Sequence, residues 1–287
     1  MSGSPPFLDH CGPLLAHYEL LLCDVWGVIH NGVESFPAAC EALQRARGQG
    51  ITVVLISNSP RPAEAVVPQL DALQVPRDCC DDMVTSGDVT TAGIRQRPGQ
   101  SVFHLGPPRD LPIYQGLQVK LVDAETADYV VCSGLFDDTT ETPEDYRPLL
   151  ERMKARGLFM LCANPDVVVE RGNELVYCAG ALADLYQSMG GEALYAGKPY
   201  APIYQLALER AEALRNAEVP LNRVLAIGDS VRTDLTGAAS LGVDFLFLTA
   251  GIHSGEIGGD TDPEPGALKL FFEDNRMPKA VMRRLVW

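Results

Sequence analysis

The feature that most constrains this chain is an alternation of short apolar runs with longer stretches of helical periodicity. Strand-length runs at Leu20–Cys23 and Ile51–Ile56 are followed by helix-like stretches at Ala38–Arg47 and Ala63–Leu73, respectively. Parallel strands need crossover helices and are covered on both faces, so this alternation predicts βαβ units around a parallel sheet. We therefore expect an α/β fold.

The same alternation of apolar runs and helical stretches returns near the end of the chain. Strand-like runs at Arg223–Ile227 and Phe245–Leu248 flank a helical stretch at Thr233–Leu241. Because both ends of the chain share one pattern, we expect them to form one Rossmann-like parallel sheet core.

The middle third has strands and helices of its own. A helix is predicted at Pro143–Arg156, with Thr142 as its N-cap and Pro at its first position. The strand candidates of this region are Ser101–Leu105, Tyr129–Cys132 and Leu158–Cys162. We expect an inserted α/β cap domain at residues 98–194 and a core at residues 1–97 and 195–287.

Composition excludes several partners. The net charge of −15 repels phosphate backbones, so we expect no nucleic-acid partner. No run reaches the roughly 18 apolar residues that span a bilayer, and no basic residue precedes an apolar segment at the N-terminus. We expect a cytoplasmic protein that is not in a membrane.

The eight cysteines lack C-x-x-C spacing, and we expect reduced, buried thiols.

Polar side chains follow the predicted core strands. Asp24 follows the first strand, Ser57 and Asn58 follow the second, and Asp229 follows the strand near the C-terminus. In an open parallel sheet these strand ends share one edge, where ligands bind. The sequence therefore predicts one site built from distant segments.

Four segments carry a family resemblance. They are Asp24-Val-Trp-Gly-Val, Ser57-Asn58-Ser59, Gly197-Lys198-Pro199 and Gly228-Asp229-Ser230-Val-Arg-Thr-Asp234. In this order they resemble the signature motifs of haloacid dehalogenase (HAD) superfamily hydrolases. The Gly-Lys-Pro form and the insertion before it are most similar to the class IIA, NagD-like branch. The resemblance covers nearly the whole chain and implies the HAD fold.

The resemblance implies a phosphatase that uses Mg²⁺. Asp24 would attack phosphorus and form an aspartyl-phosphate, which divides one displacement into two easier steps. Asp24, Asp229 and Asp234 would supply oxygen ligands to Mg²⁺. The Trp26 carbonyl joins this ligand set by family analogy.

The substrate would be a small phosphorylated metabolite. Lys198 would neutralise developing charge, while the Ser57 hydroxyl and the amides near Asn58 would hold a phosphate oxygen. In the cap, Asn164 and Asp166 are candidates for substrate specificity. Sugar phosphates, nucleotides and pyridoxal phosphate occur in the related branch, and the sequence does not choose among them. The resemblance is compatible with a homodimer, although the sequence identifies no interface.

One residue departs from the family pattern. Phosphatases of this superfamily normally carry a second Asp two residues after the nucleophile, where this chain has Trp26. Indole cannot exchange a proton at useful pH, and losing a general acid costs about 10²–10⁴-fold in rate. Three alternatives follow: a weak or selective phosphohydrolase, helped by a neighbour such as His30 or by a good leaving group; a non-catalytic phospholigand-binding protein; or a dehalogenase.

Overall fold

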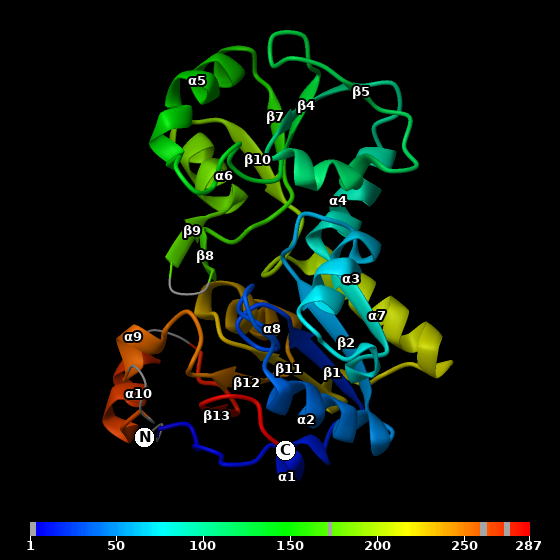
Figure 1. Cartoon of the computed structure of the whole chain (residues 1–287), viewed down its shortest axis with the longest axis vertical. Helices are drawn as coiled ribbons and strands as arrows, with labels where there is room; N and C mark the ends of the chain where they lie inside the picture. The colour runs from blue at the N-terminus through cyan, green and yellow to red at the C-terminus, as the bar shows by residue number, and fades with distance from the viewer. Residues whose placement is uncertain (1–3, 172–173, 259–262, 273–275) are drawn as a thin grey trace. The chain divides into compact units, whose positions relative to one another are not determined.

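A computed structural model describes most of the chain (Figure 1), namely residues 4–171, 174–258, 263–272 and 276–287. The chain divides into two compact units. The first unit comprises Met1–Ser57, Gln69–Val84 and Tyr204–Trp287, and the second comprises Asn58–Pro68 and Thr85–Ile203. The core and cap boundaries expected from the sequence stay a prediction.

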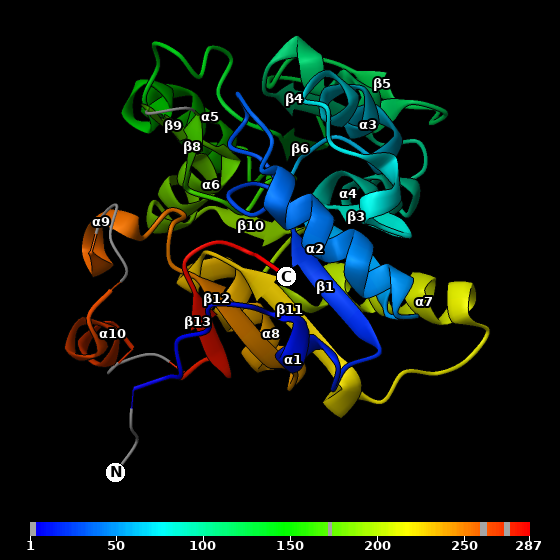
Figure 2. The ribbon, with the colours of Figure 1, turned by 60° about the horizontal axis from the view of Figure 1, so that its bottom comes forward.

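A six-stranded sheet of order β13-β12-β11-β1-β2-β3 forms the first unit. Figure 2 shows β13, β12, β11 and β1 in succession. The strands are β1 (Leu20–Asp24), β2 (Thr52–Ser57), β3 (Asp82–Thr85), β11 (Val224–Gly228), β12 (Asp244–Leu248) and β13 (Ala280–Met282). Strands β1, β2 and β11 are buried along their whole length and pair in parallel, which confirms the predicted α/β class.

The register of this sheet aligns the strand ends. Cys23 in β1 lies opposite Ile227 in β11, and Asp24 lies opposite Ile56 in β2. Each strand therefore ends within a residue or two of its neighbour. The segments that follow β1, β2 and β11 consequently leave the sheet at one common edge, as the sequence predicts.

Helices pack on this sheet, with α2 against β2 and α8 against β12. The helical segments that lie wholly or mostly in the first unit are α1 (Gly12–Leu15), α2 (Pro37–Gly48), η1 (Arg77–Cys79), α7 (Ala201–Arg215), η4 (Leu221–Arg223), η5 (Val231–Leu235), α8 (Thr236–Leu241), α9 (Ser254–Ile257) and α10 (Pro265–Phe271). The predicted helix Thr233–Leu241 in fact begins two residues earlier, with the π-helical turn η5. The Ser230 side chain causes this earlier start, because it accepts a hydrogen bond from Thr233 N at 3.3 Å.

The second unit has its own parallel sheet, of order β10-β7-β6-β4-β5, and a separate antiparallel hairpin of β8 and β9. The strands are β4 (Ser101–Leu105), β5 (Lys120–Leu121), β6 (Tyr129–Cys132), β7 (Phe159–Cys162), β8 (Val168–Arg171), β9 (Glu174–Tyr177) and β10 (Glu192–Tyr195). The strands predicted for the middle third are thus present in one sheet. This confirms that the inserted region is itself α/β.

Both faces of the second sheet are covered. Val130 and Met160 point into one apolar cluster, with α6 (Ala179–Ser188), and their neighbours Val131 and Leu161 point into another. Successive side chains of a strand face opposite sides, so two clusters from adjacent residues mean burial on both faces. This explains the near-continuous apolar runs that the sequence shows.

The remaining helical segments lie wholly or partly in the second unit. They are α3 (Ala63–Ala72), which spans both units, α4 (Ser86–Arg95), η2 (Pro108–Tyr114), η3 (Pro143–Tyr146) and α5 (Arg147–Ala155). The predicted helix Pro143–Arg156 is therefore a 3₁₀ turn followed by an α-helix. Pro148 lacks the N–H that an α-helical bond to Glu144 would need, which favours the tighter first turn. The predicted Thr142 cap is present, with Asp145 closing a capping box at 2.8 Å.

None of the helices in the described ranges is both long enough and apolar enough to cross a membrane.

Candidate active site

Asp24 is the last residue of β1 and is 8% exposed. Its carboxylate Oδ1 accepts a hydrogen bond from Val25 N at 2.7 Å. The next backbone amide thus fixes the orientation of the side chain at the end of a fully buried strand. A carboxylate held in this way presents its second oxygen in a defined direction.

Asp24, Asp229 and Asp234 form an acidic cluster. One carboxylate oxygen from each lies within 4.8 Å of the other two, and all three residues are buried. Like charges this close repel strongly when they are shielded from water. A cation beside the three carboxylates therefore stabilises their ionised form.

Backbone amides hold the two aspartates that follow β11. Asp229 Oδ2 accepts from Ile252 N at 3.0 Å, and Asp234 Oδ2 accepts from Ser230 N at 3.2 Å. Asp234 lies in η5 at the start of a helical segment, where the helix dipole favours a negative side chain. The loops after β11 and β12 thus position both carboxylates.

Two glycines leave the space that the Asp229 carboxylate occupies. A Cβ at Gly27 would lie 2.2 Å from Asp229 Oδ2, and a Cβ at Gly251 would lie 1.9 Å from the same atom. Gly27 also has φ +82°, a conformation that favours glycine. Sequence reasoning missed both roles. The available signal was a glycine within three residues after β1 and after β12.

This donor set fits a divalent metal. It consists only of carboxylate oxygens, which hard cations such as Mg²⁺, Mn²⁺ and Ca²⁺ prefer over softer metals. The cluster carries three formal negative charges in a buried setting, which a divalent cation would largely offset. These residues can therefore hold a divalent cation.

Trp26 packs within its own loop. Its ring meets His30 edge to face, with ring centroids 5.0 Å apart, and a Cβ at Gly32 would lie 2.5 Å from the indole. His30 is 2% exposed, and its Nδ1 accepts a hydrogen bond from Gly32 N at 3.0 Å. Burial lowers the pKa of His30 to about 4. At neutral pH the ring is therefore uncharged and cannot act as a general acid.

In the second unit, Asn58 holds the backbone of Lys198. Lys198 N donates to Asn58 Oδ1 at 2.7 Å, and Asn58 Nδ2 donates to the Lys198 carbonyl at 3.2 Å. Asn58 Nδ2 also donates to Asp166 Oδ1 at 2.9 Å. Three of the residues expected in the site are thus linked directly. Lys198 is 3% exposed, so its ammonium group is shielded from bulk water.

Asn164 shapes the turn that carries Asp166. Its Oδ1 accepts from Asp166 N at 3.1 Å, and the residue is 9% exposed. The backbone at Gly197 passes close to Asn58 as well, since a Cβ there would lie 2.3 Å from Asn58 Oδ1. The glycine of the Gly-Lys-Pro segment is therefore required by the amide that holds Lys198.

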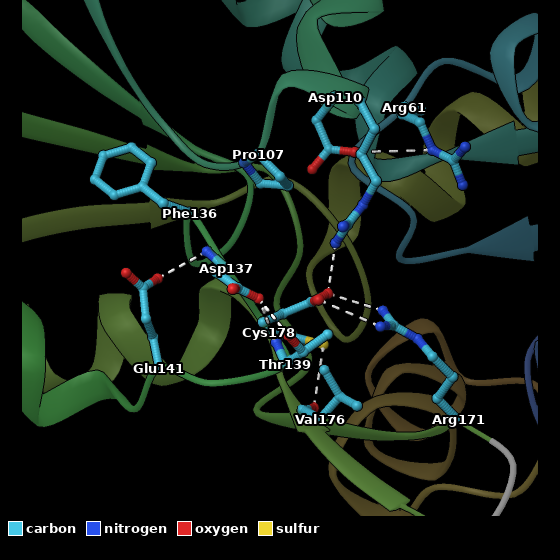
Figure 3. A network of polar contacts seen from close by, with 12 residues as sticks. Arg61, Pro107, Asp110, Phe136, Asp137, Thr139, Glu141, Arg171, Val176 and Cys178 are labelled. Atoms are coloured by element: carbon cyan, nitrogen blue, oxygen red, sulfur yellow. Dashed lines mark hydrogen bonds and ion pairs between the residues drawn. The ribbon is translucent and has the colours of Figure 1, made fainter.

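A polar network that the sequence did not indicate extends through the second unit. The Arg61 guanidinium points to the buried Asp110 carboxylate at 3.8 Å (Figure 3). Asp138 accepts from Arg109 Nη2 at 2.5 Å and from Arg171 Nη2 at 2.8 Å. Burial raises the pKa of Asp110. The pairs join loops that are tens of residues apart, with no local pattern to reveal them.

The structure therefore gathers the predicted residues in two groups. In the first unit, Ser57 ends β2 at the sheet edge where the acidic cluster lies. In the second unit, Asn58, Lys198 and Asp166 are bonded together. The roles expected for these residues stay predictions, as does the metal contact of the Trp26 carbonyl.

Two family models match this chain. A model described as haloacid dehalogenase-like hydrolase matches residues 21–120, and a HAD-hydrolase-like model matches residues 195–268. A crystal structure of a haloacid dehalogenase-like hydrolase from Brucella suis is 46% identical, with a TM-score of 0.88. The match covers 97% of this chain and all of that one. The chain belongs to the haloacid dehalogenase-like hydrolases.

Other HAD relatives are more distant. The 5'-nucleotidase YutF of Bacillus subtilis is 25% identical over 86% of this chain and 93% of its own length. NagD from Escherichia coli has the same fold at 21% identity, with a TM-score of 0.64, over 93% of this chain and 96% of that one. These similarities confirm the predicted HAD fold, and the NagD-like branch stays a prediction.

Proposed function

We propose that this phosphatase-like hydrolase removes a phosphoryl group from a small phosphorylated metabolite through an aspartyl-phosphate at Asp24. The observation that carries the proposal is the buried cluster of Asp24, Asp229 and Asp234 at the edge where parallel strands end. A similar protein carries the name 5'-nucleotidase, which supports a phosphate substrate.

Asp24 acts as the nucleophile. The carboxylate oxygen Oδ2 forms a bond to phosphorus while the bond from phosphorus to the leaving oxygen breaks, and the leaving group departs with the electron pair. Water then attacks the aspartyl-phosphate, which releases inorganic phosphate and regenerates the carboxylate. The bond from Val25 N to Oδ1 keeps the carboxylate oriented during both steps.

Asp24, Asp229 and Asp234 would hold Mg²⁺, with the Trp26 carbonyl as a further ligand. When bound, this ion offsets the repulsion between the nucleophile and the phosphate dianion. Ile252 N and Ser230 N keep the two supporting carboxylates in place, so the oxygen donors are preorganised before substrate arrives.

Lys198, Ser57 and Asn58 would bind the phosphoryl group. The buried ammonium of Lys198 stabilises the negative charge that develops in the transition state. The Ser57 hydroxyl and backbone amides near Asn58 donate to a phosphate oxygen. The two hydrogen bonds between Asn58 and the Lys198 backbone fix the position of this lysine.

Trp26 and His30 limit the range of substrates. Neither side chain supplies a proton to a leaving oxygen at neutral pH, because indole does not ionise and His30 stays neutral. We therefore propose that the substrate has a leaving group that needs no proton, as in an acyl phosphate. Turnover of ordinary phosphomonoesters is then weak, by about 10²–10⁴-fold relative to a site with a general acid.

The test is metal-dependent phosphate release on an acyl phosphate and a panel of phosphomonoesters. Wild type is compared with Asp24→Asn and with Trp26→Asp, which restores a carboxyl group. Trp26→Phe controls for lost packing, and Asp9→Asn controls for a lost surface charge. We expect Mg²⁺-dependent release that vanishes in Asp24→Asn, and a gain on monoesters in Trp26→Asp alone.

Ligand-binding and halide-release measurements on the same protein separate the other candidates. Saturable binding of phosphate compounds without turnover on any substrate would favour a phospholigand-binding protein. Halide release from a haloacid without any phosphate release would favour a dehalogenase. Either result contradicts the proposed phosphatase.

A further inference from the structure

Two loops of the first unit bond to each other beside the acidic cluster. The loop after β11 carries Asp229, and the loop after β12 carries Ile252 and His253. Ile252 N donates to Asp229 Oδ2 at 3.0 Å. In the opposite direction, Val231 N donates to the His253 ring nitrogen Nε2 at 3.3 Å. Each loop therefore donates one backbone hydrogen bond to the other.

The amide of Val231 begins a helical turn. This turn, η5, starts at Val231 and contains Asp234, whose Oδ2 accepts from Ser230 N at 3.2 Å. The first amides of a helical segment have no carbonyl partner within it, so their acceptors must come from elsewhere. The His253 ring supplies the acceptor for the first amide of η5. His253 therefore holds the start of the turn that carries Asp234.

Glu256 sets the orientation of the His253 ring. His253 is the N-cap residue of α9, and its Nδ1 lies 2.6 Å from Oε1 of Glu256 in the same short helix. Because Nε2 accepts a hydrogen bond from Val231, the ring proton is on Nδ1. Nδ1 consequently donates to the Glu256 carboxylate, and this bond keeps Nε2 turned toward the backbone of Val231.

Aromatic side chains pack against the same ring. The centroid of the His253 ring lies 5.2 Å from that of Phe271 and 6.3 Å from that of Phe247. Such packing restricts the ring, but it does not require a nitrogen, because a phenyl ring can pack in the same way. The hydrogen bond to Val231 does require one. Substitutions at this position can therefore separate the two contributions.

The sheet anchors the loop that carries His253. Thr249 N donates to the Met282 carbonyl at 2.8 Å, and Ala250 N donates to the Arg283 carbonyl at 3.0 Å. The loop contacts the β11 loop only a few residues later, at His253. Its two ends are thus held by separate sets of bonds, and the short segment between them has little freedom to move.

We propose that His253 is a positioning residue that keeps Asp229 and Asp234 close enough to bind one divalent cation. This inference rests on the proposed function, in which both carboxylates hold Mg²⁺. One oxygen from each already lies within 4.8 Å of the other. His253 acts through the Val231 amide and the turn η5. Without its Nε2, the start of the turn loses an anchor and the carboxylates are less well preorganised for the ion.

Two substitutions separate the hydrogen bond from the packing. His253→Gln keeps an acceptor, because Gln Oε1 can take the place of Nε2, but it removes the aromatic ring. His253→Phe keeps the ring and removes the acceptor. Titration calorimetry of the full chain with Mg²⁺ should show affinity about threefold to tenfold weaker in His253→Phe and close to wild type in His253→Gln.

Two further measurements depend on neither metal nor turnover. In the metal-free protein, the Val231 amide should exchange with heavy water about threefold to tenfold faster in His253→Phe, and at nearly the wild-type rate in His253→Gln. The ¹⁵N spectrum of the wild-type His253 imidazole should show its proton on Nδ1. Circular dichroism establishes that each variant is folded.

Three results would overturn the inference while leaving the proposed function intact. They are wild-type Mg²⁺ affinity in His253→Phe, equally weakened affinity in both variants, and a wild-type His253 proton on Nε2. The third needs no variant, so the inference remains testable even if a substitution prevents folding.

Failure of the proposed function gives a different pattern. A wild-type protein that binds Mg²⁺ but releases no phosphate, together with weaker Mg²⁺ binding in His253→Phe alone, would contradict the phosphatase and support the role of His253. A wild-type protein that binds no Mg²⁺ would overturn both.

Discussion

Gly27 lies so close to the Asp229 carboxylate that a Cβ atom at position 27 would stand 2.2 Å from Asp229 Oδ2. The residue has φ +82°, which glycine adopts freely and other residues adopt at a cost. The loop after the proposed nucleophile thus fixes the position of a proposed metal ligand. The two segments come from strands about two hundred residues apart in the sequence.

Gly27→Ala should weaken metal binding by displacing Asp229. Gly50→Ala is the matched control, because Gly50 has a similar φ of +86° but a Cβ added there would meet no atom within 4 Å. Both substitutions cost about 1 to 2 kcal/mol of unfolding free energy through the backbone. Titration calorimetry with Mg²⁺ should show weaker binding only in Gly27→Ala. Equal affinities in the two variants would contradict this prediction.

Asp234→Asn should have opposite effects on the metal-free and metal-bound protein. Removing one of three adjacent buried charges relieves repulsion, so the variant should melt at a higher temperature than wild type in EDTA. Wild type should gain about 2.7 kcal/mol at a Mg²⁺ concentration of 100 times Kd, and the variant should gain less. Asp9→Asn, at an exposed acid, should leave both melting temperatures unchanged. A variant that is less stable in EDTA would count against the repulsion.

His30 should make unfolding free energy depend on pH. Burial lowers its pKa from 6.5 to about 4. The stability that the neutral ring contributes is therefore fully present above pH 6.5 and is lost as the pH falls toward 4. This shift in pKa corresponds to about 3 kcal/mol of unfolding free energy. In His30→Asn, the Asn Oδ1 can replace Nδ1 as acceptor for Gly32 N. Urea unfolding of this variant should show a smaller change of unfolding free energy between pH 6.5 and pH 4. His17→Asn, at an exposed histidine, should keep the slope, and a slope retained in His30→Asn would rule out this origin.

Asp138→Asn should loosen the β8–β9 hairpin. This hairpin is a separate two-stranded sheet, and Arg171 in β8 bonds to Asp138 through Nη2 at 2.8 Å. Two-stranded hairpins are marginally stable alone, so losing this charged bond should speed amide exchange of the hairpin about threefold to tenfold. Glu144→Gln breaks an exposed pair with Arg147 and should not affect it. Unchanged exchange in Asp138→Asn would show that other contacts hold the hairpin.

The sheets of the fold could largely be predicted because buried parallel strands appear in the sequence as continuous apolar runs. Leu20–Cys23 and Ile51–Ile56 are such runs, and both became strands of the core sheet. Strand β3 escaped prediction because Asp82 and Thr85 interrupt its apolar character. The hairpin of β8 and β9 was missed for a similar reason, since charged residues end β8 and begin β9.

The acidic cluster could be predicted because each carboxylate follows a strand or opens a helix within a motif. Two polar contacts of the second unit could not be predicted. The bond from Asn58 to Asp166 and the pair of Arg61 with Asp110 depend on tertiary packing, and no local sequence pattern indicates either pairing.

The phosphoenzyme itself tests the central claim most directly. With Trp26 in place of a second Asp, no side chain at that position activates water, so the aspartyl-phosphate should persist after reaction with an acyl phosphate and Mg²⁺. Rapid acid quench followed by peptide mass spectrometry should find one added phosphoryl group on peptide 1–45, at Asp24, and none in Asp24→Asn. Phosphate release by Asp24→Asn at the wild-type rate, or a phosphoryl group on another residue, would contradict the account.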